Sequence, residues 1–315
     1  MKNIAIIGVG ALGKRHLQSM VDLQDQCNIY AVEINEKLIR VLNTEFTDVN
    51  FITTIDELPI ELDVVVIATT SNVRRLLFEE LINHSVVKYV LFEKILFQKE
   101  EDYYFVQEKL NELGISAWVN CARREWDSYK SLEKELADCN ELHISASGGE
   151  WGLGCNAIHI LDLIEYLSGN EIESLDISKL ENNIIESKRK GFYEFFGTIS
   201  GVAGRCKNYN ITCMDNSVLP FRIEINTDKS RYLIDEGNNF LLISDVESNW
   251  QWKQREFQQV YQSQMTGKVL KSIIDNGTCN LSDYESSMKL HLKYIKPLMD
   301  FFKDNGMEEN ICPIT

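Results

Sequence analysis

Three glycines near the start of the chain have the spacing of a dinucleotide-binding turn. Gly8, Gly10 and Gly13 follow directly on an apolar run, residues 3–7, and precede a stretch with helical character. In such a turn the first glycine permits a tight bend, and the second lets the backbone approach a pyrophosphate. The third allows the helix to pack closely on its strand. This pattern predicts binding of a dinucleotide.

The residues after the glycines extend this prediction. The amides of Ala11 and Leu12 would face the phosphates at the N-terminus of the helix. A second apolar run, residues 28–32, ends in Glu33, twenty residues after Gly13. A carboxylate there accepts hydrogen bonds from ribose hydroxyls and repels a 2′-phosphate. We therefore expect NAD rather than NADP, a preference that a nearby Arg or Lys could relax.

The elements that must position these residues alternate between strand and helix. Apolar runs predict strands at 3–7, 28–32, 50–53, 63–68, 88–92 and 115–120, with helices from residue 14 onward and at 73–83 and 100–112. Such alternation implies βαβ units and a parallel sheet. The fold expected for residues 1–122 is an α/β Rossmann domain that binds NAD.

The pattern changes from about residue 124. Runs with β character at 140–147, 195–202, 209–213, 221–225 and 231–243 are accompanied by helical stretches at 125–137, 156–167, 254–275 and 283–302. We expect residues 123–315 to form an α+β domain with a mostly antiparallel open sheet. This domain would bind substrate and complete the active site. An exposed sheet face is commonly buried against a second subunit, so we expect a homodimer or homotetramer.

Composition excludes several classes of partner. A net charge of −16 disfavours nucleic acid, whose phosphates require a basic surface. The eight cysteines include no CxxC pair, which argues against a metal site and against a disulfide framework. No run of eighteen apolar residues and no signal peptide is evident, so we expect a soluble cytoplasmic protein without membrane contact.

Five motifs in order along the chain resemble those of the Gfo/Idh/MocA family, named for glucose-fructose oxidoreductase, inositol dehydrogenase and a rhizopine-catabolism protein. They are the glycine turn continuing into residues 14–17, residues 68–72, residues 92–94, the Arg123-Arg124 pair with Tyr129, and residues 157–162. The resemblance covers nearly the whole chain. It implies hydride transfer between a nicotinamide and a carbon that bears a hydroxyl, usually on a sugar, a cyclitol or a derivative such as a sugar nucleotide or sugar acid.

The resemblance also implies two catalytic residues. Lys94 matches the catalytic lysine of the family, and it follows a strand at the end where an open α/β sheet binds its ligand. Its ammonium group could hydrogen-bond the reacting oxygen, whereas an isolated lysine would usually be a solvated surface group. His159 matches the family's histidine, and its imidazole could accept the proton of the substrate hydroxyl. Its apolar neighbours are equally compatible with a packed core histidine.

Other residues are expected to contact cofactor or substrate. By resemblance, Thr69, Ser71 and Asn72 lie at the nicotinamide ribose and Glu93 on the cofactor side, although the first three also suit an ordinary turn. Arg123 and Arg124 could clamp a carboxylate or phosphate of the substrate, or could pair with the protein's own carboxylates. His16 is expected to be structural.

One position departs from the family pattern. Many members carry an aspartate four residues before the histidine, whereas this chain has Cys155. Asn156 could supply a substrate hydrogen bond instead, and Asp162 could orient the imidazole, but neither restores the charge at the same place. Two alternatives therefore stay open beside the dehydrogenase: an NAD-using glycoside hydrolase of the same family, and a non-catalytic sensor of NAD and sugar. Retention of Lys94 and His159 argues against the sensor.

Overall fold

The computed structural model describes residues 1–308 and 310–315, and the chain divides into two compact units. The first unit comprises Met1–Asn120 together with Val260–Met288, and the second comprises Cys121–Gln259 together with Lys289–Thr315. The expected division into residues 1–122 and 123–315 thus differs from the observed one, because a segment from late in the chain returns to the first unit. Local sequence patterns carry no information on such a return.

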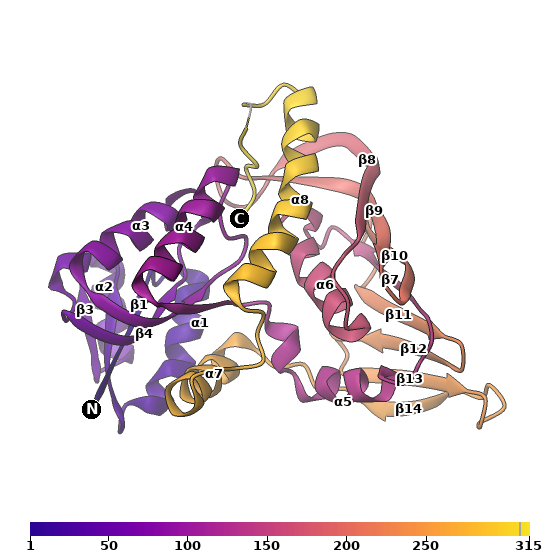
Figure 1. The fold of residues 1–315 in the computed structure, drawn as a ribbon, viewed down its shortest axis with the longest axis horizontal. Helices are drawn as coiled ribbons and strands as arrows, with labels where there is room; N and C mark the ends of the chain where they lie inside the picture. Colours follow the sequence, from indigo (N-terminus) through magenta and orange to yellow (C-terminus); the bar gives the residue numbers. More distant parts are fainter. Residues whose placement is uncertain (309) are drawn as a thin grey trace. The chain divides into compact units, whose positions relative to one another are not determined.

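The first unit is built on a six-stranded sheet with the order β3-β2-β1-β4-β5-β6 (Figure 1). All of its neighbouring strands are parallel. The strands are β1 (Lys2–Ile7), β2 (Cys27–Val32), β3 (Val49–Ile52), β4 (Glu61–Ile67), β5 (Val86–Phe92) and β6 (Ser116–Val119). The expected Rossmann sheet is confirmed, and its central strands are apolar because both faces are covered.

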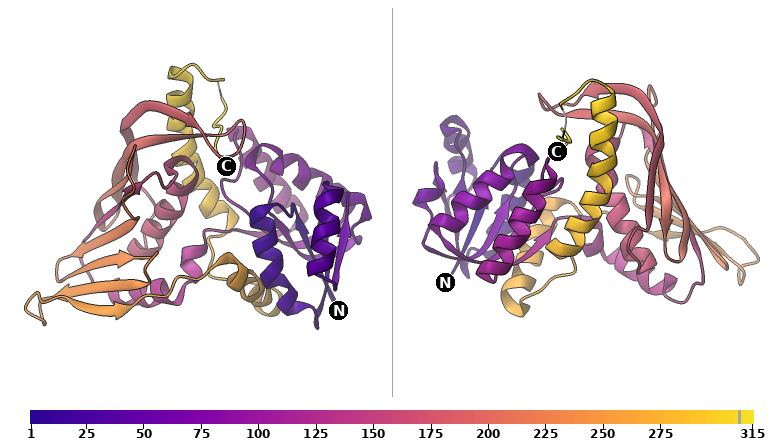
Figure 2. Two further views of the ribbon diagram at one scale, coloured as in Figure 1. Left: turned by 180° about the vertical axis from the view of Figure 1, so that it is seen from behind. Right: turned by 45° about the horizontal axis from the view of Figure 1, so that its top comes forward.

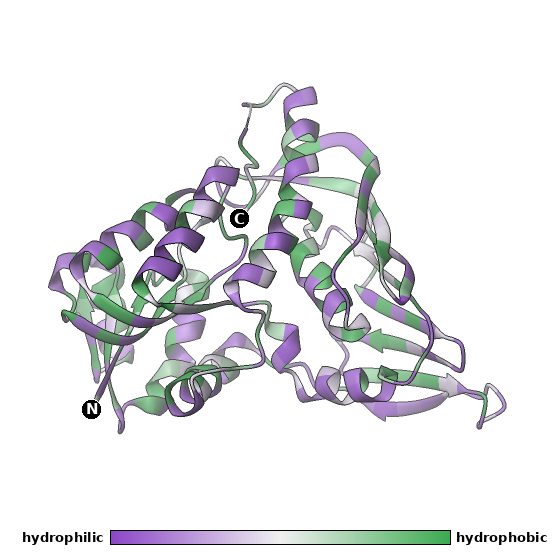
Figure 3. Cartoon of the chain, in the orientation of Figure 1, coloured by the Kyte–Doolittle hydropathy of each residue, from purple (hydrophilic) through white to green (hydrophobic). Residues whose placement is uncertain are grey.

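Five helices belong entirely to this unit: α1 (Ala11–Met20), α2 (Glu36–Glu45), α3 (Ser71–His84), α4 (Glu100–Leu113) and α7 (Gln262–Asn276). Helices α3 and α4 pack together on one face of the sheet, and α1 and α7 pack together on the other (Figures 1 and 2). Bands of hydrophilic and hydrophobic residues alternate along α3 and α4 in Figure 3. This amphipathic pattern is what a helix covering one sheet face requires.

Helices α1 and α7 approach closely because α7 has a glycine at the contact. A Cβ atom at Gly267 would lie 2.2 Å from the carbonyl oxygen of Ser19. The Gly267 amide also donates a 2.9 Å hydrogen bond to the Ser19 hydroxyl, and both residues are buried. This contact attaches the late segment of the chain to the Rossmann sheet.

The second unit is built on an eight-stranded sheet with the order β14-β13-β12-β11-β7-β10-β9-β8. Its pairs are antiparallel except for the parallel β7–β10 pair, as expected for a mostly antiparallel sheet. The strands are β7 (Leu142–Gly149), β8 (Ser174–Glu186), β9 (Tyr193–Ala203), β10 (Cys206–Met214), β11 (Arg222–Thr227), β12 (Ser230–Asp235), β13 (Phe240–Asp245) and β14 (Lys253–Glu256).

Helix α6 (Leu153–Ser168) packs on strands β7, β9 and β10 and on α5 (Asp127–Leu136). Residues 289–304 of α8 (Tyr284–Asp304) also belong to this unit, where Phe301 and Phe302 pack against Phe195 of β9. Along β7, buried residues alternate with more exposed ones, so this strand turns one face inward and the other outward.

Two predicted elements are wrong in detail. The single helix expected over residues 254–275 is strand β14 followed by α7, which begins only at Gln262. The single strand expected over residues 231–243 is two strands, because the chain turns between β12 and β13, where Asn239 has a φ of 55°. Strand β8 was not predicted, since its residues are mainly polar and exposed.

Three negative findings concern the part of the chain that the structure describes. None of its helices combines the length and apolar character needed to cross a bilayer. None of its His, Cys, Asp and Glu side chains gather in groups of three or more that could hold a metal ion. Its cysteines form no disulfide bond.

Candidate active site

Residues predicted to be functional follow the strands of the parallel sheet. Gly8 follows β1, Glu33 follows β2, Thr69 lies two residues after β4, and Glu93 and Lys94 follow β5. Because the strands are parallel, their carboxyl ends share one edge of the sheet. This edge is where open α/β sheets bind ligands.

The glycine turn has the shape that a pyrophosphate requires. Gly8 has a φ of +89°, and a Cβ atom on it would lie 2.7 Å from Cγ2 of Thr69. A Cβ atom on Gly13 would lie 2.0 Å from the Gly8 carbonyl oxygen, so this helix–strand contact also needs glycine. At Gly10 a Cβ atom would meet nothing within 4 Å. The space in front of Gly10 is therefore open for close approach of a ligand.

Two further features of this edge suit a dinucleotide. Ala11 and Leu12 form the first turn of α1, where backbone N–H groups have no intrahelical acceptor. The carboxylate of Glu33 is held beside the glycine turn, because it accepts hydrogen bonds from the amides of Val9 at 3.0 Å and Asn35 at 2.9 Å. These residues fit a bound dinucleotide.

The loop after β4 leads into α3. The Thr70 hydroxyl donates a 2.7 Å hydrogen bond to the Asn72 side chain, and Ser71 is buried at the start of the helix. The buried Arg74 donates to the carbonyl oxygen of Thr69. Thr69, Ser71 and Asn72 are thus in place at the ligand-binding edge, and their contact with a nicotinamide ribose stays a prediction.

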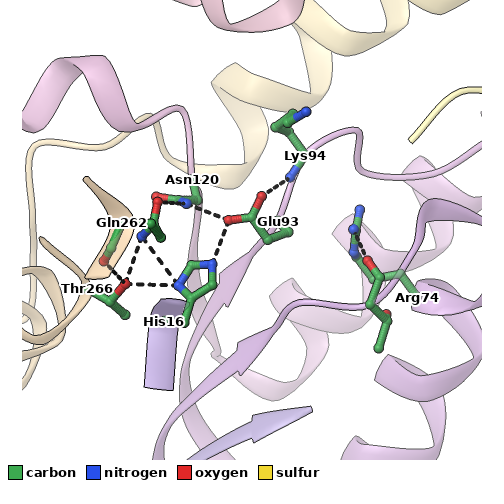
Figure 4. Close-up of polar contacts among 8 residues, drawn as sticks. His16, Arg74, Glu93, Lys94, Asn120, Gln262 and Thr266 are labelled. Carbon is green, nitrogen blue, oxygen red and sulfur yellow. Dashed lines mark hydrogen bonds and ion pairs between the residues drawn. The ribbon is translucent and has the colours of Figure 1, made fainter. Parts of the chain in front are cut away.

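Glu93 lies at the centre of a buried polar network (Figure 4). Its Oε1 atom is 2.8 Å from Nε2 of His16 and also accepts from the Asn120 amide group. The other ring nitrogen of His16 lies 2.9 Å from the Thr266 hydroxyl, and Gln262 bridges Asn120 and Thr266 at 2.8 and 2.7 Å. The Glu93 carboxylate, which was expected on the cofactor side, is therefore hydrogen-bonded to protein groups.

The network favours an ionised carboxylate. Burial alone would raise the pKa of Glu93, but the hydrogen bond and charge of His16, with the Asn120 bond, hold that pKa below its usual range. Asn120, Gln262 and Thr266 were not predicted from the sequence. The only available signal was a polar residue, Asn120, directly after a buried strand.

Lys94 is partly buried, unlike a solvated surface lysine. Its amide donates a 3.3 Å hydrogen bond to Oε2 of Glu93, and its side chain points away from the network in Figure 4. The next peptide bond, Lys94–Ile95, is cis. Arg74 donates to the carbonyl oxygens of Ile95 and, at 2.8 Å, Leu96.

In the second unit, α6 carries the other predicted catalytic residue. His159 is partly buried, so it is not a fully enclosed core histidine. The Asn156 side chain donates a 2.8 Å hydrogen bond to the carbonyl oxygen of Trp151. Asp162 is buried, and its Oδ2 atom accepts from Nε of Arg124 at 2.8 Å. Lys94 and His159 thus belong to different units of the chain.

Both predicted clamp arginines pair with carboxylates of the protein. Arg123 donates from Nε and Nη2 to the two oxygens of Glu236, at 2.7 and 2.6 Å, and the Tyr129 hydroxyl donates to Glu236 at 2.5 Å. Burial and the Glu236 charge raise the pKa of Tyr129 well above its usual value. Of the two roles considered for these arginines, the structure shows internal pairing.

A pocket of about 470 Å³ opens beside this ion pair. Arg123 and Glu236 line it with Trp151, Asn156, Phe221 and Asn238, among others. The rings of Trp151 and Phe221 lie 4.8 Å apart. Aromatic faces combined with hydrogen-bonding side chains suit a small polar ring compound. The pocket therefore contains Arg123 and Asn156, two of the residues predicted to bind substrate.

A carboxylate that sequence analysis missed lies at the N-terminus of α6. Glu194 of β9 accepts from the amides of Gly154 at 2.6 Å and Cys155 at 3.2 Å. A negative charge is favourable at a helix N-terminus. The backbone at position 155 thus contacts a carboxylate from another element, although residue 155 is not an aspartate.

Comparisons with known proteins agree with this architecture. Residues 2–120 match the GFO_IDH_MocA family model, described as the oxidoreductase family with an NAD-binding Rossmann fold. The resemblance predicted from the motifs is thereby confirmed for residues 2–120. No curated protein matches the chain.

Solved structures with the same fold cover nearly the whole chain. UDP-N-acetylglucosamine 3-dehydrogenase GnnA from Acidithiobacillus ferrooxidans is 15% identical with a TM-score of 0.72, covering 94% of this chain and 97% of that one. The dehydrogenase MviM from Clostridium difficile is 14% identical with a TM-score of 0.74, covering 95% and 99%. A super-repressor mutant of Gal80p from Saccharomyces cerevisiae is 14% identical with a TM-score of 0.74, covering 98% and 96%. At these identities the likeness shows the fold.

Proposed function

Because residues 2–120 carry the NAD-binding fold of the Gfo/Idh/MocA oxidoreductases, we propose that the chain is an NAD-dependent dehydrogenase or reductase. It acts on a carbinol or ketone carbon of a sugar, cyclitol or sugar derivative. The observation that carries the proposal is the partly buried Lys94 on the sheet edge that also presents the glycine turn and Glu33. The dehydrogenases GnnA and MviM share the fold, which supports the same reaction class.

The roles of the residues follow from their chemistry. A bound nicotinamide supplies the acceptor or donor of the hydride. Lys94 hydrogen-bonds the reacting oxygen and stabilises the charge that develops there. The His159 imidazole takes the proton of the substrate hydroxyl, or returns it in the reverse direction. Glu33 binds the adenosine ribose and disfavours a 2′-phosphate, so NAD is preferred.

The pocket of the second unit supports a carbohydrate-like substrate. It offers the aromatic pair Trp151 and Phe221 together with the amide side chains of Asn156 and Asn238. The Arg123 charge is neutralised by Glu236. We propose that this pocket binds the substrate ring, with Asn156 as a hydrogen-bonding group. GnnA, a sugar-nucleotide dehydrogenase by name, makes sugar nucleotides the first compounds to try.

Two measurements test the proposed function. Nicotinamide fluorescence on titration with NADH and NADPH should show tighter binding of NADH. A panel of sugars, cyclitols and sugar nucleotides should then give a substrate-dependent change in nicotinamide absorbance. Lys94→Ala should lower kcat about a hundredfold or more, since the loss of one group that stabilises developing charge costs on this scale. Lys88→Ala, a change on the same strand β5, serves as the matched control.

Other outcomes would favour the alternatives. Release of an aglycone from a glycoside, with tightly held NAD and no net absorbance change, would identify a hydrolase. Binding of NADH and a sugar without turnover of either kind would indicate a sensor; Gal80p, whose super-repressor mutant has the same fold, makes a regulatory role worth testing. Lys94→Ala with wild-type activity would contradict the proposed role of this lysine.

A further inference from the structure

The turn that carries Lys94 is held from both sides by buried charged side chains. Before Lys94, Glu93 is 2% exposed and its Oε2 atom accepts the Lys94 amide. After Lys94, the guanidinium group of Arg74, on α3, donates to the carbonyl oxygens of Ile95 and Leu96. The side chains of Ile95 and Leu96 are fully buried. Holding the backbone on both sides of Lys94 fixes the direction in which its side chain leaves the turn.

The hydrogen bonds around His16 connect Glu93 to α7. The Thr266 hydroxyl donates to the Gln262 carbonyl oxygen at 3.3 Å and accepts from the Gln262 side-chain nitrogen at 2.7 Å. The same hydroxyl lies 2.9 Å from Nδ1 of His16, which is also 3.4 Å from the Gln262 side-chain nitrogen. Nε2 of His16 faces the Glu93 carboxylate at 2.8 Å, and because a carboxylate only accepts, Nε2 donates. The buried imidazole is therefore held on both sides, by Glu93 and by the side chains of α7.

The contact between Glu93 and His16 is supported by α7, from a later part of the chain. Gln262 and Thr266 lie one helical turn apart on α7, and both reach the network. The charged neighbours that act on Glu93 are His16 and Lys94. A buried carboxylate that accepts three donors cannot rotate without breaking hydrogen bonds, so it makes a rigid support.

We propose that Glu93, His16 and Arg74 are positioning residues that hold the Lys94 turn in its catalytic conformation, with Gln262 and Thr266 holding His16 against Glu93. The inference rests on the proposed catalytic role of Lys94. It gives Glu93 a role in positioning Lys94 rather than in binding the cofactor. It also gives His16 and α7 a function in the reaction that goes beyond packing.

The decisive variant is Glu93→Gln, which keeps the size of the side chain. An amide has one oxygen and one NH₂ group, so its NH₂ must face either the Lys94 amide or the His16 and Asn120 donors. We expect kcat to fall about tenfold to a hundredfold, while KM and the NADH dissociation constant change less than about threefold. Hydrogen exchange of residues 93–97 should accelerate on the order of tenfold. Arg74→Lys keeps the positive charge but loses the paired N–H donors of the guanidinium group. It should likewise lower kcat while KM and the NADH dissociation constant change little.

A second variant and a control distinguish the positioning role from general destabilisation of the protein. Thr266→Val leaves Glu93 intact but removes the hydroxyl beside Nδ1 of His16, so it should accelerate exchange at residues 93–97 in the same direction. Nitrogen NMR of the His16 ring should show a protonated Nε2 in the wild type, where it donates to the Glu93 carboxylate, and a changed Nε2 signal in Glu93→Gln. Lys271→Ala changes the exposed face of α7, where Lys271 pairs with Asp275, and it should leave exchange at residues 93–97 and kcat unchanged.

The outcomes separate the two proposals. If Lys94→Ala is inactive while Glu93→Gln keeps wild-type kcat and wild-type exchange at residues 93–97, the positioning role is wrong and the proposed function stands. If Lys94→Ala retains full activity, the proposed catalytic role of Lys94 is wrong. If no compound on the panel reacts, exchange and the His16 NMR signals still decide whether the network holds the turn.

Discussion

Buried carboxyl groups of this protein have pKa values that their surroundings shift in different directions. The Glu93 carboxylate is buried among hydrogen-bond donors, whereas Glu165, near the end of α6, is partly buried beside Asp162. Burial is the main cause that raises the pKa of Glu165 from 4.5 to about 7, with Asp162 adding to the rise. Two residues of the same type thus have pKa values shifted in opposite directions.

The raised pKa of Glu165 predicts a pH dependence of stability. A carboxyl group with a higher pKa in the folded state contributes stability that is fully present below pH 4.5 and is lost as the pH rises through about 7. Glu165→Gln should remove this contribution, which amounts to at most about 3 kcal/mol. Urea unfolding at pH 4.5 and pH 8 measures it.

Two comparisons make that experiment specific. The glutamine can still accept the Ile172 amide, which now bonds to Glu165 at 2.8 Å. Glu181→Gln, on the exposed part of β8, should leave the pH dependence as in the wild type. An equal pH dependence in wild type and Glu165→Gln would show that Glu165 titrates normally in the folded protein.

Among the elements, the contact between α1 and α7 has the greatest consequence for the site. Helix α1 carries His16, and α7 carries Gln262 and Thr266, so the polar network depends on these two helices lying together. Gly267 allows this approach, since a Cβ atom there would collide with backbone. The spacing of the two helices is therefore determined by one residue without a side chain.

Gly267→Ala should destabilise the first unit. The methyl group would lie 2.2 Å from the Ser19 carbonyl oxygen, so one helix must shift. We expect a loss of about 1 to 3 kcal/mol in the free energy of unfolding. Gly237→Ala is a suitable control, because its Cβ atom would meet nothing closer than 3.7 Å. Equal free energies of unfolding for the two variants would show that α7 can shift without loss of stability.

For the whole molecule, the main finding is that the first unit is discontinuous in sequence. It needs Val260–Met288 in addition to Met1–Asn120. The side chains of Asn120 and Gln262 are hydrogen-bonded at 2.8 Å, so the two segments meet where the chain leaves and re-enters the unit. The intervening residues form the second unit with its own sheet and pocket.

This organisation predicts how fragments behave. A fragment of residues 1–122 lacks α7 and leaves His16 without Thr266, so it should melt at a lower temperature and less cooperatively than the same residues joined through a short Gly/Ser linker to 260–288. Circular dichroism on heating compares the two. Identical melting curves would mean that the Rossmann sheet does not need α7 for stability.

Much of the first unit could be predicted from the sequence alone. The apolar runs that became β1, β2, β4 and β5, the glycine turn and Glu33 are local patterns, because strand periodicity and tight turns depend on residues near in sequence. The order of the motifs was enough to predict the family fold and the lysine after β5. Polar strands such as β8 were not predicted, since they bury too little apolar surface to produce a pattern of apolar residues in the sequence.

Only the tertiary structure decided how distant residues combine. The pairing of His16 with Glu93 and Thr266, of Arg123 with Glu236, and of Arg124 with Asp162 joins residues 38 to 250 positions apart. Residue types alone could not tell whether an arginine holds a ligand or an internal carboxylate, because either partner satisfies the same charge. The return of α7 was likewise unpredictable, since it depends on packing around Gly267 and on no local periodicity.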